Sequence, residues 1–178
     1  PYFLESMWSF SLNAYITRCQ SVLQQGRPHN DVLLYWPLHD LWMSGGNREL
    51  RFSVHHPQWI EETPCGEAGQ WMIDHGYTFD YISDGQLLRT TCADDVLRTE
   101  GGTEYRSVLI PAARHITLET ARQMLSLAEA GATVLVWKQL PDDVPGWHDH
   151  SGRRHQLSEL LRHISLSPDG SGVVGKGK

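Results

Sequence analysis

The strongest constraint on the fold is an apolar run, DVLLYWP, at positions 31–37. A near-continuous apolar strand of this kind is typical of a parallel sheet that helices cover on both faces. An amphipathic helical pattern from Phe10 to Leu23 precedes the strand, and Gly26 before Pro28 supplies a stop signal for that helix. The run therefore predicts an α/β fold whose sheet is buried on both sides.

Strand and helix patterns alternate along the rest of the chain. We expect further strands at 77–82, 105–110 and 132–137, a brief extra strand at 96–97, and helices at 66–75, 118–130 and 156–164. The connections between the main strands are long enough for crossovers, so these strands should be parallel. The predicted fold class is a flavodoxin-like three-layer α/β sandwich with a mostly parallel central sheet, a layout shared by class I glutamine amidotransferases.

The length of 178 residues with 40% hydrophobic content suits one domain, which we place at 1–165. We expect the leading helix, within 1–26, to be available for packing against an upstream domain. The Gly-, Ser- and Lys-rich tail at 166–178 is expected to be disordered. The chain starts at Pro1 rather than at methionine, which indicates a piece of a longer polypeptide, an expression product or a processed protein.

Composition argues against several classes of function. The net charge is −6 and no stripe of Lys and Arg is present, which disfavours nucleic acid binding. No run of about 18 apolar residues occurs, so we expect no membrane span. Cys19, Cys65 and Cys92 form neither a CxxC pair nor an even set, so neither a zinc site nor a disulfide framework is indicated. We expect no metal and no cofactor.

The segment after the third main strand argues against one enzyme class with this layout. An amidotransferase would place a nucleophilic Cys in a Gly-x-Cys-x-Gly turn after a central strand, because that turn exposes the sulfur beside backbone amides. Positions 111–115 read PAARH, with neither Cys nor Gly. We therefore expect an amidotransferase-like layout without the nucleophilic Cys.

Polar and aromatic residues follow three of the predicted strands. They are His39, Asp40 and Trp42 after the first strand, Asp84 after the second and His115 after the third. Because ligands of α/β sheets bind at the carboxyl ends of strands, these five residues are the candidate substrate-binding cleft. A structural alternative stays open, in which His39 and Asp40 bond to loop backbone and Trp42 packs on the sheet. For Asp84 we favour capping of the following turn.

Other polar clusters are expected to be solvated. A glycosidase normally needs two carboxyl groups facing each other across the sugar. The acidic pairs at 61–62, 94–95 and 142–143 are instead adjacent residues in polar stretches. The histidines within 148–155 lie in a segment rich in Pro, Gly and Asp, which disfavours a metal site. We therefore assign no catalytic residue.

Several blocks of the sequence resemble one family of enzymes. These blocks are similar to the segment that follows the catalytic barrel in large bacterial glycoside hydrolases of the α-L-rhamnosidase type. Together they cover most of the chain, within residues 8–138. The blocks are YITRCQ at 15–20, LQQGRP at 23–28, YWPLHDLW at 35–42, GYTFDYISD at 76–84, YRSVLIP at 105–111 and AEAGATV at 128–134.

The resemblance implies an accessory or site-completing α/β domain of a carbohydrate-degrading enzyme, inactive in isolation. Its expected partners are an upstream catalytic barrel of the same polypeptide and a carbohydrate, with no nucleic acid and no membrane. Its location is periplasmic or extracellular if the parent enzyme is exported. The alternative is a free-standing module that binds a sugar or another small molecule at the carboxyl ends of the strands. The sequence upstream of Pro1 would distinguish the two.

Overall fold

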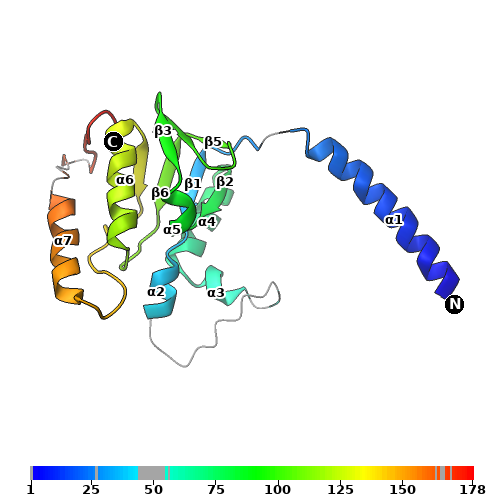
Figure 1. The fold of residues 1–178 in the computed structure, drawn as a ribbon, viewed down its shortest axis with the longest axis horizontal. Helices are drawn as coiled ribbons and strands as arrows, with labels where there is room; N and C mark the ends of the chain where they lie inside the picture. The colour runs from blue at the N-terminus through cyan, green and yellow to red at the C-terminus, as the bar shows by residue number, and fades with distance from the viewer. Residues whose placement is uncertain are drawn as a thin grey trace.

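Four parallel strands form the main sheet of the part of the chain that the structure describes (Figure 1). The structure is a computed structural model, and it describes residues 2–26, 28–43, 55, 57–162, 164, 167–168 and 170–178. The strand order is β2-β1-β6-β7, so the prediction of a mostly parallel sheet is confirmed. The strands are β1 (Val32–Tyr35), β2 (Phe79–Ile82), β6 (Ser107–Ile110) and β7 (Thr133–Val136).

Helices cover both faces of this sheet, because the central strand β1 is apolar on both sides. Leu33 and Tyr35 enter one core together with residues of α6 and α7. Val32 and Leu34 point to the other face, where they pack against residues of α4. The resulting three layers confirm the predicted sandwich. The covering helices are α4 (Pro64–Asp74), α6 (Leu118–Ala130) and α7 (His150–Arg162).

Local signals set the ends of the covering helices. Thr117 caps α6, since its hydroxyl accepts a hydrogen bond from the Thr120 N–H at 3.1 Å. Gly131 ends the same helix with a φ of 123°, which residues with a Cβ rarely adopt. At the start of α4, the Thr63 hydroxyl accepts from the Gly66 N–H at 3.2 Å. These caps fix where each helix meets the sheet.

A second, antiparallel sheet lies between β2 and β6 in the chain. Asp94 and Asp95 have φ values of 52° and 62°, the left-handed geometry of a tight hairpin turn between β3 and β4. The predicted strand at 105–110 is wrong at its start. Tyr105 pairs with β4 of the antiparallel sheet, and the strand of the main sheet begins at Ser107. The strands of the antiparallel sheet, within the described residues, are β3 (Thr91–Ala93), β4 (Val96–Arg98) and β5 (Glu104–Tyr105).

The C-terminal part differs from the prediction in two places. Helix α7 begins at His150 rather than near 156. The Arg153 side chain donates to three backbone carbonyls between 145 and 148, which holds the preceding loop against the first turn of this helix. Within the tail at 166–178, which we expected to be disordered, Lys178 is hydrogen-bonded to the main sheet, where the Val134 N–H donates to the Lys178 carbonyl at 2.7 Å.

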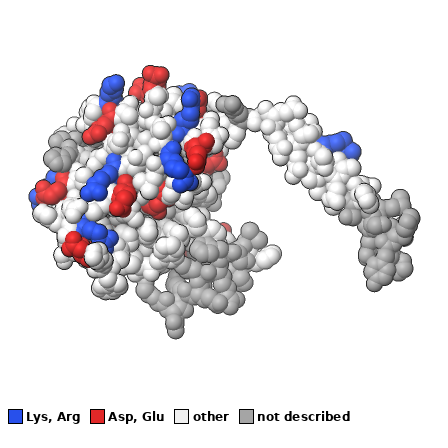
Figure 2. All heavy atoms as spheres, viewed as in Figure 1, with Lys and Arg blue, Asp and Glu red and all other residues white. Residues whose placement is uncertain are grey.

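The leading helix α1 (Tyr2–Leu23) extends away from the sheet and its covering helices (Figure 1). Its predicted apolar side chains, such as Phe10, Tyr15 and Val22, are exposed. On the face seen in Figure 2, acidic and basic side chains are mixed over the rest of the molecule, without a single-sign patch. No helix in the described ranges is both long and apolar enough to cross a membrane.

Leu34→Ala should lower the free energy of unfolding by about 2–4 kcal/mol, because Leu34 is fully buried in β1 and its truncation leaves a cavity. Leu23→Ala is the matched control, since Leu23 is 77% exposed in α1. We expect its effect to stay within about 0.5 kcal/mol. Urea unfolding followed by circular dichroism measures both. Equal stability of the two variants would contradict the buried position of β1.

Candidate functional site

The candidate site lies at the carboxyl ends of β1 and β6, the two strands from which the chain continues to opposite sides of the sheet. From β1 the chain passes to β2 on one side, and from β6 it passes to β7 on the other. In α/β folds, ligands bind outside the carboxyl ends of the strands at this switch point. Helix α2 (Leu38–Met43) follows β1 and carries His39 and Asp40, while Arg114 and His115 follow β6.

Asp40 joins the two loops that leave β1 and β6. One of its carboxylate oxygens accepts from the Arg114 backbone N–H at 2.7 Å. The other accepts from the His115 backbone N–H at 2.7 Å and lies 2.6 Å from His115 Nδ1. The structural alternative for Asp40 is thus correct in part, because two of these contacts are to loop backbone. The contact with the His115 ring places two predicted site residues side by side.

Asp84 links the ends of β1 and β2 to α6. Its Oδ1 accepts hydrogen bonds from the Tyr35 hydroxyl at 2.9 Å and the Thr120 hydroxyl at 2.6 Å. His39 Nε2 lies 3.6 Å from Oδ2. The favoured capping role was wrong, because Ser83 is the N-cap of α5 (Asp84–Leu87). Burial, together with the charge of Asp84, raises the pKa of Tyr35 far above its usual range, so this hydroxyl stays a donor.

Trp42 is the exposed member of the group. Its ring meets the His39 imidazole edge-on, with centroids 5.6 Å apart and planes at 82°. The side chain is 59% exposed. Packing of Trp42 on the sheet, the structural alternative, is therefore wrong, and an indole surface is open to solvent beside His39.

A third loop joins the site through Asp143. This residue is 6% exposed, so the expectation that the 142–143 pair is solvated was wrong for Asp143. Its carboxylate lies 2.7 Å from His150 Nε2 and 3.8 Å from His115 Nε2. Burial opposes the charge of Asp143, but the Val144 N–H and the His150 imidazole outweigh it and hold the pKa of Asp143 below its usual value. The loop after β7 is thus fixed to the loop after β6.

All five predicted site residues therefore lie at one edge of the sheet. The structure brings them together as two contacting pairs, His39 with Asp84 and Asp40 with His115, and the Trp42 ring contacts His39. Sequence reasoning missed five other members of this network. Two of them, Asp143 and His150, follow the fourth strand. The rule that ligands bind at the carboxyl ends of strands would have drawn attention to these two residues. The missed residues are Tyr35, Arg114, Thr120, Asp143 and His150.

These contacts limit the chemistry that the site can perform. The Asp40 and Asp84 carboxylates accept from fixed protein donors, and Asp143 is buried. Burial raises the pKa of the Cys65 thiol to about 12, so Cys65 is not an activated nucleophile. Within the described ranges, no group of three or more His, Cys, Asp or Glu residues is arranged to hold a metal ion.

Comparisons with known proteins place this geometry in a family. The family model described as alpha-L-rhamnosidase matches residues 58–178. The solved structure of the rhamnosidase from Novosphingobium sp. PP1Y is similar in fold, with a TM-score of 0.56 over 92% of this chain and a sequence identity of 22%. The matched region is 14% of that chain, so the present chain spans a small part of its length. None of the curated proteins compared with the chain matches it.

The family model covers well over half of the chain, and the sandwich fold agrees with the solved rhamnosidase. This chain belongs to the alpha-L-rhamnosidase family of glycoside hydrolases.

Proposed function

We propose that this chain is an accessory, site-completing α/β domain of a carbohydrate-degrading glycoside hydrolase. Family membership and the small share of the solved rhamnosidase that the chain matches both support a domain within a longer enzyme. The proposed partner is a catalytic barrel of the same polypeptide, which carries the acid and the base. The proposed ligand is the carbohydrate bound by that barrel.

The observation that carries this proposal is the exposed indole of Trp42 beside polar groups at the switch point. An aromatic face can stack on the C–H face of a sugar ring, while nearby polar groups orient its hydroxyls. His39 and Asp84 are both partly exposed next to this indole. In this proposal Trp42, His39 and Asp84 contact the sugar. Asp40 and His115 act as positioning residues, because they hold the loops on either side.

The same geometry supports an inactive isolated domain. Glycoside hydrolysis normally uses one carboxyl group as acid and a second as base or nucleophile, on opposite sides of the scissile bond. At this edge, Asp40 binds loop backbone, Asp84 binds two hydroxyls, and Asp143 is buried. No two of these three carboxylates are left free to serve as such a pair. A free-standing sugar-binding module would use the same edge, and the assays below separate it from a domain of an enzyme.

The purified 178-residue chain should show no turnover of an aryl α-L-rhamnoside, because Asp40, Asp84 and Asp143 offer no free carboxylate pair at the carboxyl edge of the sheet. Release of the chromogenic phenol, followed by absorbance, measures this directly. The parent polypeptide under the same conditions is the positive control. Turnover by the isolated chain that Asp40→Asn abolishes would contradict the accessory role. An inactive parent polypeptide that still binds the sugar would favour the binding module.

Trp42→Ala in the parent polypeptide should raise KM for the aryl rhamnoside about tenfold, since an aromatic contact of roughly 1.4 kcal/mol corresponds to that factor. Because Trp42 is exposed, the melting temperature should change little. Steady-state kinetics and thermal unfolding measure the two effects. Tyr77→Ala is the matched control, because Tyr77 is an exposed aromatic residue that precedes β2 and so lies at the opposite edge. Equal KM values for both variants would sink the assignment of Trp42.

A further inference from the structure

Trp147 is the most exposed large apolar side chain among the described residues, at 92%. It lies in the loop between β7 and α7, which the candidate site includes only through Asp143. A single exposed apolar side chain is common on protein surfaces and carries little information where the backbone moves freely. What gives Trp147 significance is the way in which its loop is held.

The backbone around Trp147 is fixed by a side chain of α7. Arg153 donates three hydrogen bonds of 2.7–2.8 Å to backbone carbonyls, those of Pro145, Gly146 and His148. These carbonyls lie on both sides of Trp147 in the sequence. Because Arg153 orders the loop and the indole does not, a ligand that stacks on Trp147 has only one side chain to immobilise. A tryptophan side chain has two χ angles, so this cost is small.

The loop lies at the same edge of the sheet as Trp42. It leaves the carboxyl end of β7, and α2, which contains Trp42, leaves the carboxyl end of the parallel strand β1 (Figure 1). Only β6 separates these two strands. Neighbouring strands are about 4.8 Å apart, so the two segments leave the sheet about 10 Å from each other. One edge therefore carries both exposed indoles.

A row of side-chain contacts connects the two segments. Asp40 in α2 lies 2.6 Å from His115 Nδ1, and His115 Nε2 lies 3.8 Å from the Asp143 carboxylate. The other oxygen of Asp143 lies 2.7 Å from His150 Nε2, at the start of α7. The segments that carry the two exposed indoles are therefore held by one polar network.

Polar side chains follow Trp147 in the sequence. They are His148, Asp149 and His150, and all three are at least partly exposed. A docking surface for another protein has an apolar core of several side chains. A sugar instead combines a C–H face, which stacks on an aromatic ring, with hydroxyls that need polar partners. A lone indole among imidazole and carboxylate groups fits a sugar better, and it repeats the arrangement around Trp42.

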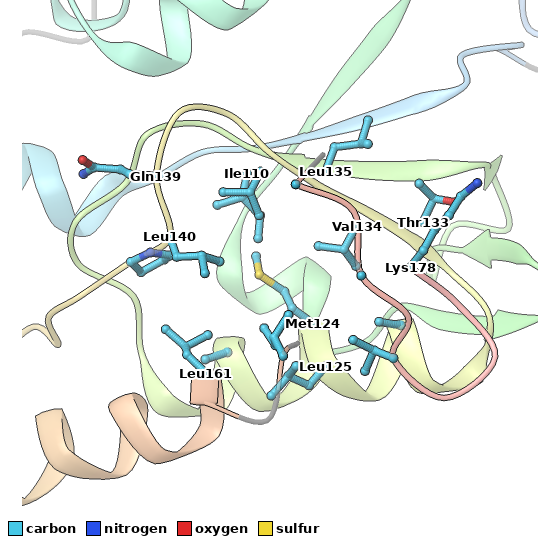
Figure 3. Close-up of a pocket in the computed structure, with 18 of the residues that line it drawn as sticks. Ile110, Met124, Leu125, Thr133, Val134, Leu135, Gln139, Leu140, Leu161 and Lys178 are labelled. Carbon is cyan, nitrogen blue, oxygen red and sulfur yellow. The ribbon is translucent and has the colours of Figure 1, made fainter. Parts of the chain in front are cut away.

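The cavity of about 680 Å³ beside β7 is not part of this surface (Figure 3). Its walls include the first residues of the loop after β7, at 138–141, but neither Trp147 nor any of the five predicted site residues. The walls are mostly apolar and give sugar hydroxyls few partners. The side chains that make them apolar include Ile110, Met124, Leu125, Val134, Leu140 and Leu161.

We infer that Trp147 is a second sugar contact at the carboxyl edge, so the carbohydrate bound there is an oligosaccharide rather than a single sugar. This inference rests on the proposed function, in which one sugar unit stacks on Trp42. Another unit of the same oligosaccharide stacks on Trp147. The loop between β7 and α7 thereby gives the site its preference for longer ligands.

The test measures inhibition of aryl α-L-rhamnoside hydrolysis by the parent polypeptide. The competitors are L-rhamnose and a panel of rhamnose-terminated tetrasaccharides. The tightest-binding tetrasaccharide should have an inhibition constant about tenfold below that of L-rhamnose, since a second aromatic contact adds a factor of this size. Trp147→Ala should remove this gain and leave inhibition by L-rhamnose unchanged. Its melting temperature should change little, because the side chain is exposed.

Two further variants serve as controls. Trp147→Phe keeps an aromatic face and should retain most of the tenfold gain. Tyr77→Ala should retain all of it, because Tyr77 is an exposed aromatic residue at the opposite edge. A gain that survives Trp147→Ala, or no gain for any tetrasaccharide with the unmodified parent polypeptide, would overturn the inference.

Two other outcomes separate the remaining explanations. If Trp147→Ala weakens inhibition by both competitors and lowers the melting temperature, the indole packs against another domain and the inference is overturned. Failure of the proposed function has a different signature, in which Trp42→Ala leaves both inhibition constants unchanged. In that case the inference fails with it.

Discussion

The pairing of β1 with a parallel strand on each side is the constraint on which the other features depend. Val32 lies opposite Phe79 of β2 and opposite Ser107 of β6. A slip of one residue would turn every side chain of β1 to the wrong face, and both faces are buried. The register therefore has one stable setting. It also determines which residues of the following loops meet at the carboxyl edge.

The polar network at that edge holds the loops after β1, β6 and β7 in fixed positions. Asp40 receives two backbone N–H groups from the loop after β6, and His115 connects Asp40 to Asp143 in the loop after β7. Loss of the Asp40 carboxylate would remove the acceptor of both of these loop N–H groups. Trp42 needs no such partner and stays exposed. The edge thus combines fixed polar supports with an open aromatic surface, the combination on which the proposed sugar contact depends.

The main strands could be predicted from the sequence because each is an apolar run. The rule that ligands bind at the carboxyl ends of strands then identified five residues that lie at the carboxyl edge of the sheet. The sequence could not show the break before Ser107, because Tyr105 and the following residues all suit a strand and the change of sheet depends on pairing with β4. The sequence also could not show that Asp143, and not the adjacent Asp142, is buried. The partners of Asp143 include the Val144 N–H and the side chains of His150 on α7 and His115 after β6. The early start of α7 depends on Arg153 bonding to loop carbonyls, which no helical pattern records.

Hydrogen exchange of the parent polypeptide with and without L-rhamnose tests most directly whether the carboxyl edge faces the carbohydrate. The account predicts slower exchange with the sugar in the peptides that contain α2 and the loop after β6, because Trp42 and its neighbours are covered. Peptides that contain Tyr77, at the opposite edge, should not change. Saturating sugar that slows exchange elsewhere in the polypeptide, but leaves α2 and that loop unchanged, would contradict the account.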